Sequence, residues 1–137
     1  NTVVGQHQGL WFYTLGQRHG LDIGGPGDAW YVAAKDMCSN VLRVVQGHDH
    51  PALMRNSAQV EELSWVEDHP SAFPFRCSAK TRYRQADQAC TLSSVGPDRI
   101  EITFDQPQRA ITPGQALVLY DDSRLIGGGV FCDLING

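Results

Sequence analysis

A short basic segment holds the residue types best suited to binding chemistry in this chain. Lys80, Arg82 and Arg84 occupy alternate positions, and Tyr83 lies among them. Alternate residues of a strand share one face, so these cations would recur about every 6.6–6.8 Å along it. Guanidinium groups pair with phosphate oxygens, and a tyrosine ring can stack on an unpaired base. The segment therefore predicts a surface that contacts a nucleic-acid backbone.

The same charges also fit an ordinary solvated face. An acidic stretch at residues 61–68 precedes the basic segment and could pair with its cations. The net charge of −4 also differs from the basic balance typical of nucleic-acid binders. An acidic average can nevertheless hide a local basic stripe, which is what a phosphate backbone interacts with. Taken alone, the residues leave nucleic-acid contact and a solvated face as equal alternatives.

The cysteines and histidines give weaker signals. The 4 cysteines include no C-x-x-C pair, so the sequence predicts reduced thiols rather than a zinc ribbon or a thioredoxin motif. The segment His48-Asp49-His50 has too few ligands for a metal site, and we interpret it as a loop or strand end. A stand-alone enzyme with a Cys/His pair remains a third hypothesis, although no spacing selects a particular pair.

Glycine-rich segments do not indicate a nucleotide site. The stretch at residues 20–27 lacks the G-K-[ST] sequence of a phosphate-binding loop. Gly127-Gly128-Gly129 lies inside a strand pattern, where a bulge or a close approach of two backbones is the usual cause. We expect no cofactor and no metal in this segment of chain.

Periodicity along the chain predicts a mainly β fold. Residues 1–28 are rich in glycine and allow one short helix, around Gln8 to Leu15. Two strands joined by a hairpin turn follow at residues 29–35 and 41–46, with a further strand at 58–66. Beyond Pro74, six short strands are expected at 75–84, 89–95, 99–105, 109–111, 115–120 and 125–132. The prediction is a small central β-rich domain with a short helix at residues 1–66, incomplete at its N-terminus, and an antiparallel six-stranded β-barrel at residues 67–137.

Composition sets the broad class. Hydrophobic residues make up 42% of the chain and charged residues 19%, which is typical of a folded domain. No apolar run reaches the roughly 18 residues of a membrane span, and no signal peptide is evident. We expect a cytoplasmic protein that contacts neither membrane nor DNA. The chain begins Asn1-Thr2 without Met, which suits an internal fragment.

Several segments together resemble the bacterial tRNA-specific 2-thiouridylases. The first is Gly5-Gln6-His7-Gln8-Gly9-Leu10, followed by the Y-T-L-G-Q-R-H-G-L stretch at residues 13–21. Further blocks follow in the family's order: W-Y-V at 30–32, Q-G-H-D-H-P at 46–51, K-T-R-Y-R-Q at 80–85, F-D-Q-P-Q-R-A at 104–110, T-P-G-Q at 112–115 and G-G-G-V at 127–130. The resemblance covers nearly all 137 residues, and the ordered set is far more specific than any one block.

The resemblance implies an enzyme larger than this chain. Its members combine an ATP-pyrophosphatase domain with a central domain and a C-terminal β-barrel. They use ATP with Mg to activate C2 of the wobble uridine in the tRNAs for Lys, Glu and Gln, and replace its oxygen with persulfide sulfur from a sulfur-relay protein. The present chain has no S-G-G-x-D-S loop, and its cysteines do not match the two catalytic ones. We therefore expect no catalytic residue here, and no activity from this chain alone.

The resemblance also assigns residues to tRNA binding, in the anticodon region. Carried over by motif, Arg82, Tyr83 and Gln115 are tRNA-contacting positions, with Lys80 and Arg84 as additional contacts. This favours RNA contact for the basic segment over a solvated face. The first segment, which contains His7, Gln17 and Arg18, receives no role. The main alternative to the whole interpretation is a translation-factor-like β-barrel that binds protein partners and has no catalytic role.

Overall fold

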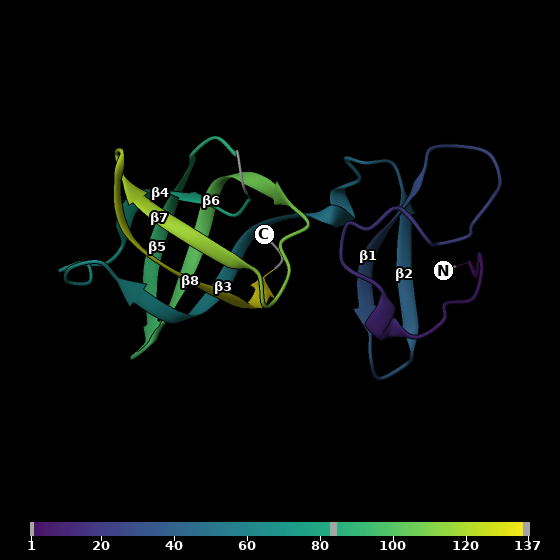
Figure 1. Cartoon of the computed structure of the whole chain (residues 1–137), viewed down its shortest axis with the longest axis horizontal. Coiled ribbons are helices and arrows are strands. Elements are labelled where there is room, and N and C mark those ends of the chain that lie inside the picture. The colour runs from purple at the N-terminus through teal and green to yellow at the C-terminus, as the bar shows by residue number, and fades with distance from the viewer. Residues whose placement is uncertain (1, 83–84, 136–137) are drawn as a thin grey trace. The chain divides into compact units, whose positions relative to one another are not determined.

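Strands dominate the chain, and the helices of its described residues are two short 3-10 turns. The computed structural model describes residues 2–82 and 85–135, with side chains as far as residue 132. The chain forms two compact units, Asn1–Met54 and Arg55–Gly137 (Figure 1). The mainly β fold expected from the sequence is confirmed.

The first unit is built on a two-stranded antiparallel sheet. Its elements are η1 (Leu10–Phe12), β1 (Trp30–Asp36), β2 (Val41–Gln46) and η2 (Pro51–Leu53). The two predicted strands are confirmed within one residue at each end, and the predicted helix is a single 3-10 turn. Asp36 shapes the hairpin turn, because its Oδ1 accepts hydrogen bonds from the main-chain N–H groups of Cys38 and Ser39.

A hairpin of two strands is marginal by itself, so other segments must cover it. The residues after η1 run beside β1, where Gly16 donates to the carbonyl of Val32 at 2.7 Å and Val32 donates to the carbonyl of Gln17 at 2.9 Å. Lys35 also donates through Nζ to the carbonyl of Tyr13 at 2.9 Å. These bonds hold the glycine-rich segment against the sheet and bury Val32 completely.

The second unit is a closed antiparallel barrel with the strand order β3-β6-β5-β4-β7-β8 (Figure 1). The strands are β3 (Met54–Trp65), β4 (Phe75–Lys80), β5 (Gln88–Gly96), β6 (Arg99–Arg109), β7 (Ala116–Asp121) and β8 (Arg124–Ile135). Closure of the sheet removes unpaired strand edges. The predicted six-stranded barrel is therefore confirmed as an architecture.

One strand of the barrel differs from the sequence prediction. The expected separate strand at 109–111 is absent from the described structure, because β6 continues through Arg109 and the chain then turns at Ala110, whose φ is 56°. The sixth strand is instead β3, which pairs with β8 from Ser57 to Trp65. The units accordingly divide after Met54 rather than at the predicted boundary after residue 66. The composition break at residues 68–74 marks the loop between β3 and β4, because the residues on both sides of it are needed to close one barrel.

Alternating side chains fill the barrel, as the sequence pattern predicted. Ile100, Ile102 and Phe104 are at most 3% exposed, and Ala79 and Leu92 are fully buried. On β4, the side chains of Phe75 and Cys77 pack against this core while Arg76 points outward. The alternation predicted for residues 75–84 therefore holds through Lys80, where β4 ends.

The three consecutive glycines of β8 lie where backbones approach closely, as expected. A Cβ added at Gly127 would lie 2.5 Å from the carbonyl oxygen of Ser64 on β3, and one at Gly128 would lie 2.6 Å from that of Leu117 on β7. A Cβ at Gly129 would lie 2.6 Å from the side chain of Val60. These contacts leave room only for hydrogen, so the glycines serve the packing of a narrow barrel.

Candidate functional site

Two loops form one rim of the barrel, and they carry the predicted binding residues. The first loop follows β4 and includes the described residues 81–82 and 85–87, and the second spans residues 110–115 between β6 and β7. Arg82 is exposed in a bend of the first loop, and its Nη2 donates to the main-chain oxygen of Arg109. Gln115 lies at the end of the second loop, directly before β7. Residues distant in sequence thus share one rim.

Thr81 connects the two loops. Its N–H donates to Oε1 of Gln85 at 2.8 Å, and its carbonyl accepts from Nε2 of Gln115 at 2.9 Å. The Oε1 of Gln115 in turn accepts from the N–H of Thr112 at 3.2 Å. Both backbone groups of Thr81, which lies just past the end of β4, are therefore satisfied by side-chain amides instead of a neighbouring strand.

The amide contacts continue into the barrel wall. Gln85 donates through Nε2 to Oε1 of Gln108 at 3.1 Å, and Gln108 donates to Oε1 of Gln88 at 3.0 Å and to the carbonyl of Gln106 at 2.9 Å. Gln108 is only 6% exposed, whereas Gln85 is half-buried. Sequence reasoning did not single out Gln85, Gln88 or Gln108, because a lone glutamine carries no pattern that predicts burial.

The remaining cations of the basic segment have different surroundings. Lys80 lies 3.3 Å from Oδ1 of Asp87 and 5.3 Å from the centroid of the Tyr120 ring, so its charge is already compensated locally. Tyr83 and Arg84 lie outside the described residues. Of the predicted binding residues, the structure therefore brings Arg82 and Gln115 to one rim and places Lys80 at the last position of β4.

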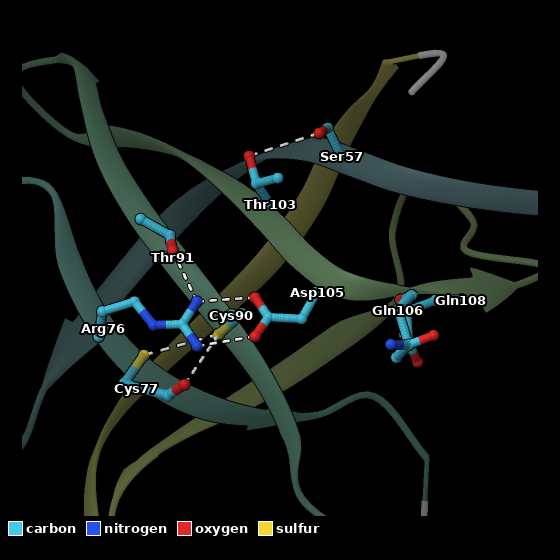
Figure 2. Close-up of polar contacts among 9 residues, drawn as sticks. All are labelled: Ser57, Arg76, Cys77, Cys90, Thr91, Thr103, Asp105, Gln106 and Gln108. Atoms are coloured by element: carbon cyan, nitrogen blue, oxygen red, sulfur yellow. Dashed lines mark hydrogen bonds and ion pairs between the residues drawn. The ribbon is translucent and has the colours of Figure 1, made fainter.

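Arg76 forms a separate polar cluster on the outer wall (Figure 2). Its guanidinium contacts both carboxylate oxygens of Asp105 at 2.7 Å and donates to Oγ1 of Thr91 at 2.9 Å. The hydrogen bonds from Arg76 lower the pKa of Asp105 below its usual value. The acidic partner of Arg76 is therefore Asp105. Within the acidic stretch at residues 61–68, Glu61 pairs with Arg99 at 3.3 Å.

Two thiols face each other across β4 and β5. Cys77 and Cys90 are paired in register, and their Sγ atoms are 3.7 Å apart (Figure 2). The hydrogen bond from Cys90 lowers the pKa of the half-buried Cys77, whereas the same contact and burial raise the pKa of Cys90, which is fully buried. The pair thus combines one ionisable thiol with one inert thiol in the barrel wall.

The segments of the first unit that had no assigned role organise local structure. His7 accepts through Nδ1 from the N–H of Gly9 at 2.9 Å, so its Nε2 carries the hydrogen and donates to the carbonyl of Asn40 at 2.9 Å. Gln17 accepts from the N–H of Thr14 and donates to the carbonyl of His19. The bond from His7 ties the glycine-rich segment to the hairpin turn, and the contacts of Gln17 fix the conformation of that segment.

The histidine pair of the first unit also has local partners. His48 contacts its neighbour Asp49 at 2.9 Å, and His50 caps η2 by accepting from the N–H of Ala52 at 3.0 Å. Over residues 2–82 and 85–132, whose side chains are described, no group of three or more His, Cys, Asp or Glu is arranged to hold a metal ion. In the same described part of the chain, no helix is long and apolar enough to cross a membrane.

Both units match known protein families. Residues 55–131 match the family described as "Aminomethyltransferase beta-barrel domain", and residues 1–46 match "tRNA methyl transferase PRC-barrel domain". Curated relatives called tRNA-specific 2-thiouridylase are similar over almost the whole chain. Those from Ralstonia nicotianae and Cupriavidus taiwanensis are 53% and 54% identical over 132 residues, covering 93% of this chain and 36% and 37% of the relatives. The one from Pectobacterium carotovorum is 50% identical over 134 residues, covering 95% of this chain and 36% of the relative. The chain thus spans just over a third of the length of these relatives.

Proposed function

Because this chain belongs to the aminomethyltransferase β-barrel family, in the form found in tRNA-specific 2-thiouridylases, we propose that its barrel is the tRNA-binding part of a tRNA-uridine 2-sulfurtransferase. The observation that carries the proposal is the meeting of Arg82 and Gln115 at one rim through Thr81. Arg82 and Gln115 belong to separate sequence motifs, and neither motif indicates that the two residues lie close together. Two residues can bind one ligand only if they lie on the same surface, and the rim meets this condition.

The rim has the chemistry expected of an RNA contact. The exposed Arg82 offers guanidinium N–H groups to phosphate oxygens, and the bond of its Nη2 to Arg109 fixes its direction. Among the described residues, the amide of Gln115 donates one hydrogen bond and accepts one. An amide can donate two and accept two, so we propose that its second N–H and second lone pair contact a ribose or a base. Tyr83 and Arg84 are proposed as further contacts.

The finer function is proposed from the family. The full enzyme would replace the C2 oxygen of the wobble uridine in the tRNAs for Lys, Glu and Gln with sulfur, using ATP and a persulfide supplied by a sulfur-relay protein in the cytoplasm. The role of this chain would be to bind the anticodon region of the tRNA and to orient it. No reaction step is assigned to its residues.

We propose that ATP is bound outside this chain. The densest glycine run of the described residues, Gly127-Gly128-Gly129, is packed against the backbones of β3 and β7 and therefore has a structural role. The four cysteines, Cys38, Cys77, Cys90 and Cys132, are free thiols, and only Cys38 is exposed. We therefore assign ATP activation and sulfur transfer to the remainder of the full enzyme.

Titration of the chain with an unmodified transcript of tRNA(Glu) tests the proposal. The wild-type chain is expected to bind, and Arg82→Ala should weaken binding and reduce the slope of log K against log salt by about one phosphate contact. The matched control is Arg124→Ala, which removes another exposed arginine, at the first position of β8. If the wild-type chain does not bind, or if both variants lose the same affinity, the tRNA-binding proposal is wrong and the protein-binding alternative gains support.

A further inference from the structure

A continuous chain of amide hydrogen bonds lies behind Arg82. It begins at Gln115, passes through the backbone of Thr81 to Gln85, and continues to the buried Gln108 and then to Gln88. The contacts join four segments, namely the loop after β4, the start of β5, the end of β6 and the loop before β7. They provide the loop after β4 with side-chain partners where strand pairing has ended.

We propose that Gln85 and Gln108 are positioning residues for the tRNA contact, holding the loop after β4 so that Arg82 faces the RNA. This inference rests on the proposed function and deepens it. Neither glutamine is proposed to touch the RNA. They would act by restricting the backbone conformations of Thr81, Arg82 and Gln85, so that less conformational entropy is lost when the RNA binds.

The position of Gln108 is the first argument. A side-chain amide that is 6% exposed must have its polar atoms satisfied, because an unpaired buried polar group is costly. Gln108 meets this requirement with partners from three places: Nε2 of Gln85, Oε1 of Gln88 and the carbonyl of Gln106. It therefore links β6 to the C-terminal end of the loop after β4 and to the first residue of β5.

The contacts of Gln85 are the second argument, because they involve both Arg82 itself and the residue before it. Oε1 of Gln85 accepts from both N and Oγ1 of Thr81, at 2.8 and 3.2 Å. The N–H of Gln85 donates to the carbonyl of Arg82 at 3.3 Å. Thr81 and Gln85 are thus fixed to each other on either side of Arg82, and Gln108 fixes Gln85 to the barrel.

The experiment is a double-mutant cycle on the 137-residue chain, with the tRNA(Glu) transcript as ligand. Gln108→Met keeps the side-chain length but removes every hydrogen bond of the amide. It should weaken tRNA binding roughly three- to tenfold and reduce the salt slope by about one, as Arg82→Ala does. In an Arg82→Ala background, Gln108→Met should cause no further loss, because the residue that it positions is already gone.

The salt slope separates positioning from a general loss of structure. A variant that is merely less stable has a smaller fraction of folded molecules that can bind tRNA. The molecules that stay folded keep all their phosphate contacts, so the slope of log K against log salt is unchanged. Gln85→Met serves as a second variant, since the side chain is half-buried and its loss disturbs the core less. Gln59→Met is the matched control: it removes a glutamine that accepts from Arg99 at 3.2 Å elsewhere on the barrel, and it should leave affinity and slope unchanged.

The outcomes for the two ideas differ. If the wild-type chain binds tRNA and Arg82→Ala weakens it, but Gln108→Met and Gln85→Met bind as wild type, then the positioning role is wrong while the proposed function stands. Equal losses from Gln108→Met with and without Arg82 would also contradict it, because the effect would then not pass through Arg82. A wild-type chain that does not bind tRNA overturns the proposed function itself.

Discussion

The side-chain amide of Gln115 donates a hydrogen bond to the main-chain oxygen of Thr81 at 2.9 Å. This one contact ties the loop before β7 to the loop after β4. It also provides a donor for the carbonyl oxygen of Thr81, which lies just past the end of β4. Two segments identified by separate motifs thus depend on each other for their conformation. Substitutions at Gln115 should affect the stability of the rim as well as any RNA contact.

Replacing Gln115 with Met should lower the free energy of unfolding by about 1–3 kcal/mol, since two hydrogen bonds to main-chain groups are lost and each contributes about 0.5–1.5 kcal/mol. Urea unfolding of the variant and the wild type measures the difference. Gln6→Met, at an exposed position in the first unit, is the control and should change stability little. An equal effect of the two substitutions would contradict the structural role of Gln115.

A methyl group at Gly128 should destabilise the barrel by about 1–3 kcal/mol or more, because the added Cβ would lie 2.6 Å from the carbonyl oxygen of Leu117 and the backbone must shift. Thermal unfolding of Gly128→Ala tests this. The control is Gly24→Ala, where no atom lies within 4 Å of the added Cβ. If Gly128→Ala has the melting temperature of the wild type, β8 does not approach β7 this closely.

The pair of Arg76 and Asp105 should make stability fall in acid. The pKa of Asp105 is lowered in the folded chain by its hydrogen bonds with Arg76. A depressed carboxyl pKa stabilises the fold above the unfolded value of about 3.9 and ceases to do so as the pH falls through the folded pKa. Asp105→Asn should therefore be less stable than the wild type at pH 7, and the difference should shrink in acid as the wild-type carboxylate is protonated.

Urea unfolding at pH 7 and under acidic conditions, with Arg76→Met as a second background, measures that contribution. With Arg76 removed, Asp105→Asn should lose its pH-dependent effect. A stability difference between the wild type and Asp105→Asn that stays constant with pH would show that the carboxylate charge is not what stabilises this cluster.

Cys77 should react with iodoacetamide well before Cys90. The hydrogen bond from Cys90 lowers the pKa of Cys77, and the thiolate is the reacting species, whereas Cys90 is fully buried and its pKa is raised. Mass spectrometry of peptides from the folded chain after brief labelling measures the order. Cys90→Ala should slow labelling of Cys77 near neutral pH, because the stabilising hydrogen bond is lost. Labelling of Cys90 before Cys77 would contradict the arrangement of the two thiols.

The chain should show no sulfurtransferase activity when incubated with ATP, a persulfide donor and unmodified tRNA. It lacks the S-G-G-x-D-S loop and any cysteine in the expected catalytic context. Mass spectrometry of nucleosides from the recovered tRNA detects 2-thiouridine directly. Thiolation above that of a sample without protein would overturn the expectation.

The sequence by itself determined the architecture and the segments worth testing. Strict alternation at residues 75–80 and 99–105 predicted which side chains face the core, because successive residues of a strand point to opposite sides. The motifs around Arg82 and Gln115 resembled those of one protein family and identified two candidate binding segments. The run of Gly127-Gly128-Gly129 indicated a close approach of backbones. Each of these signals is local, and each is readable without knowledge of the neighbouring strands.

Only the tertiary structure decided where strands end and which residues support them. Alternation in the basic segment continues past Lys80, yet β4 stops there because Thr81 finds its partners in the side chains of Gln85 and Gln115. In the same way, β3 belongs to the barrel because it pairs with β8, the last strand of the chain. The burial of Gln108 likewise follows from contacts among three segments. Such contacts join segments that are distant in sequence, so they produce no periodic pattern of residue types. Closure of the barrel determines which strands and side chains meet, and this cannot be read from neighbouring residues along the chain.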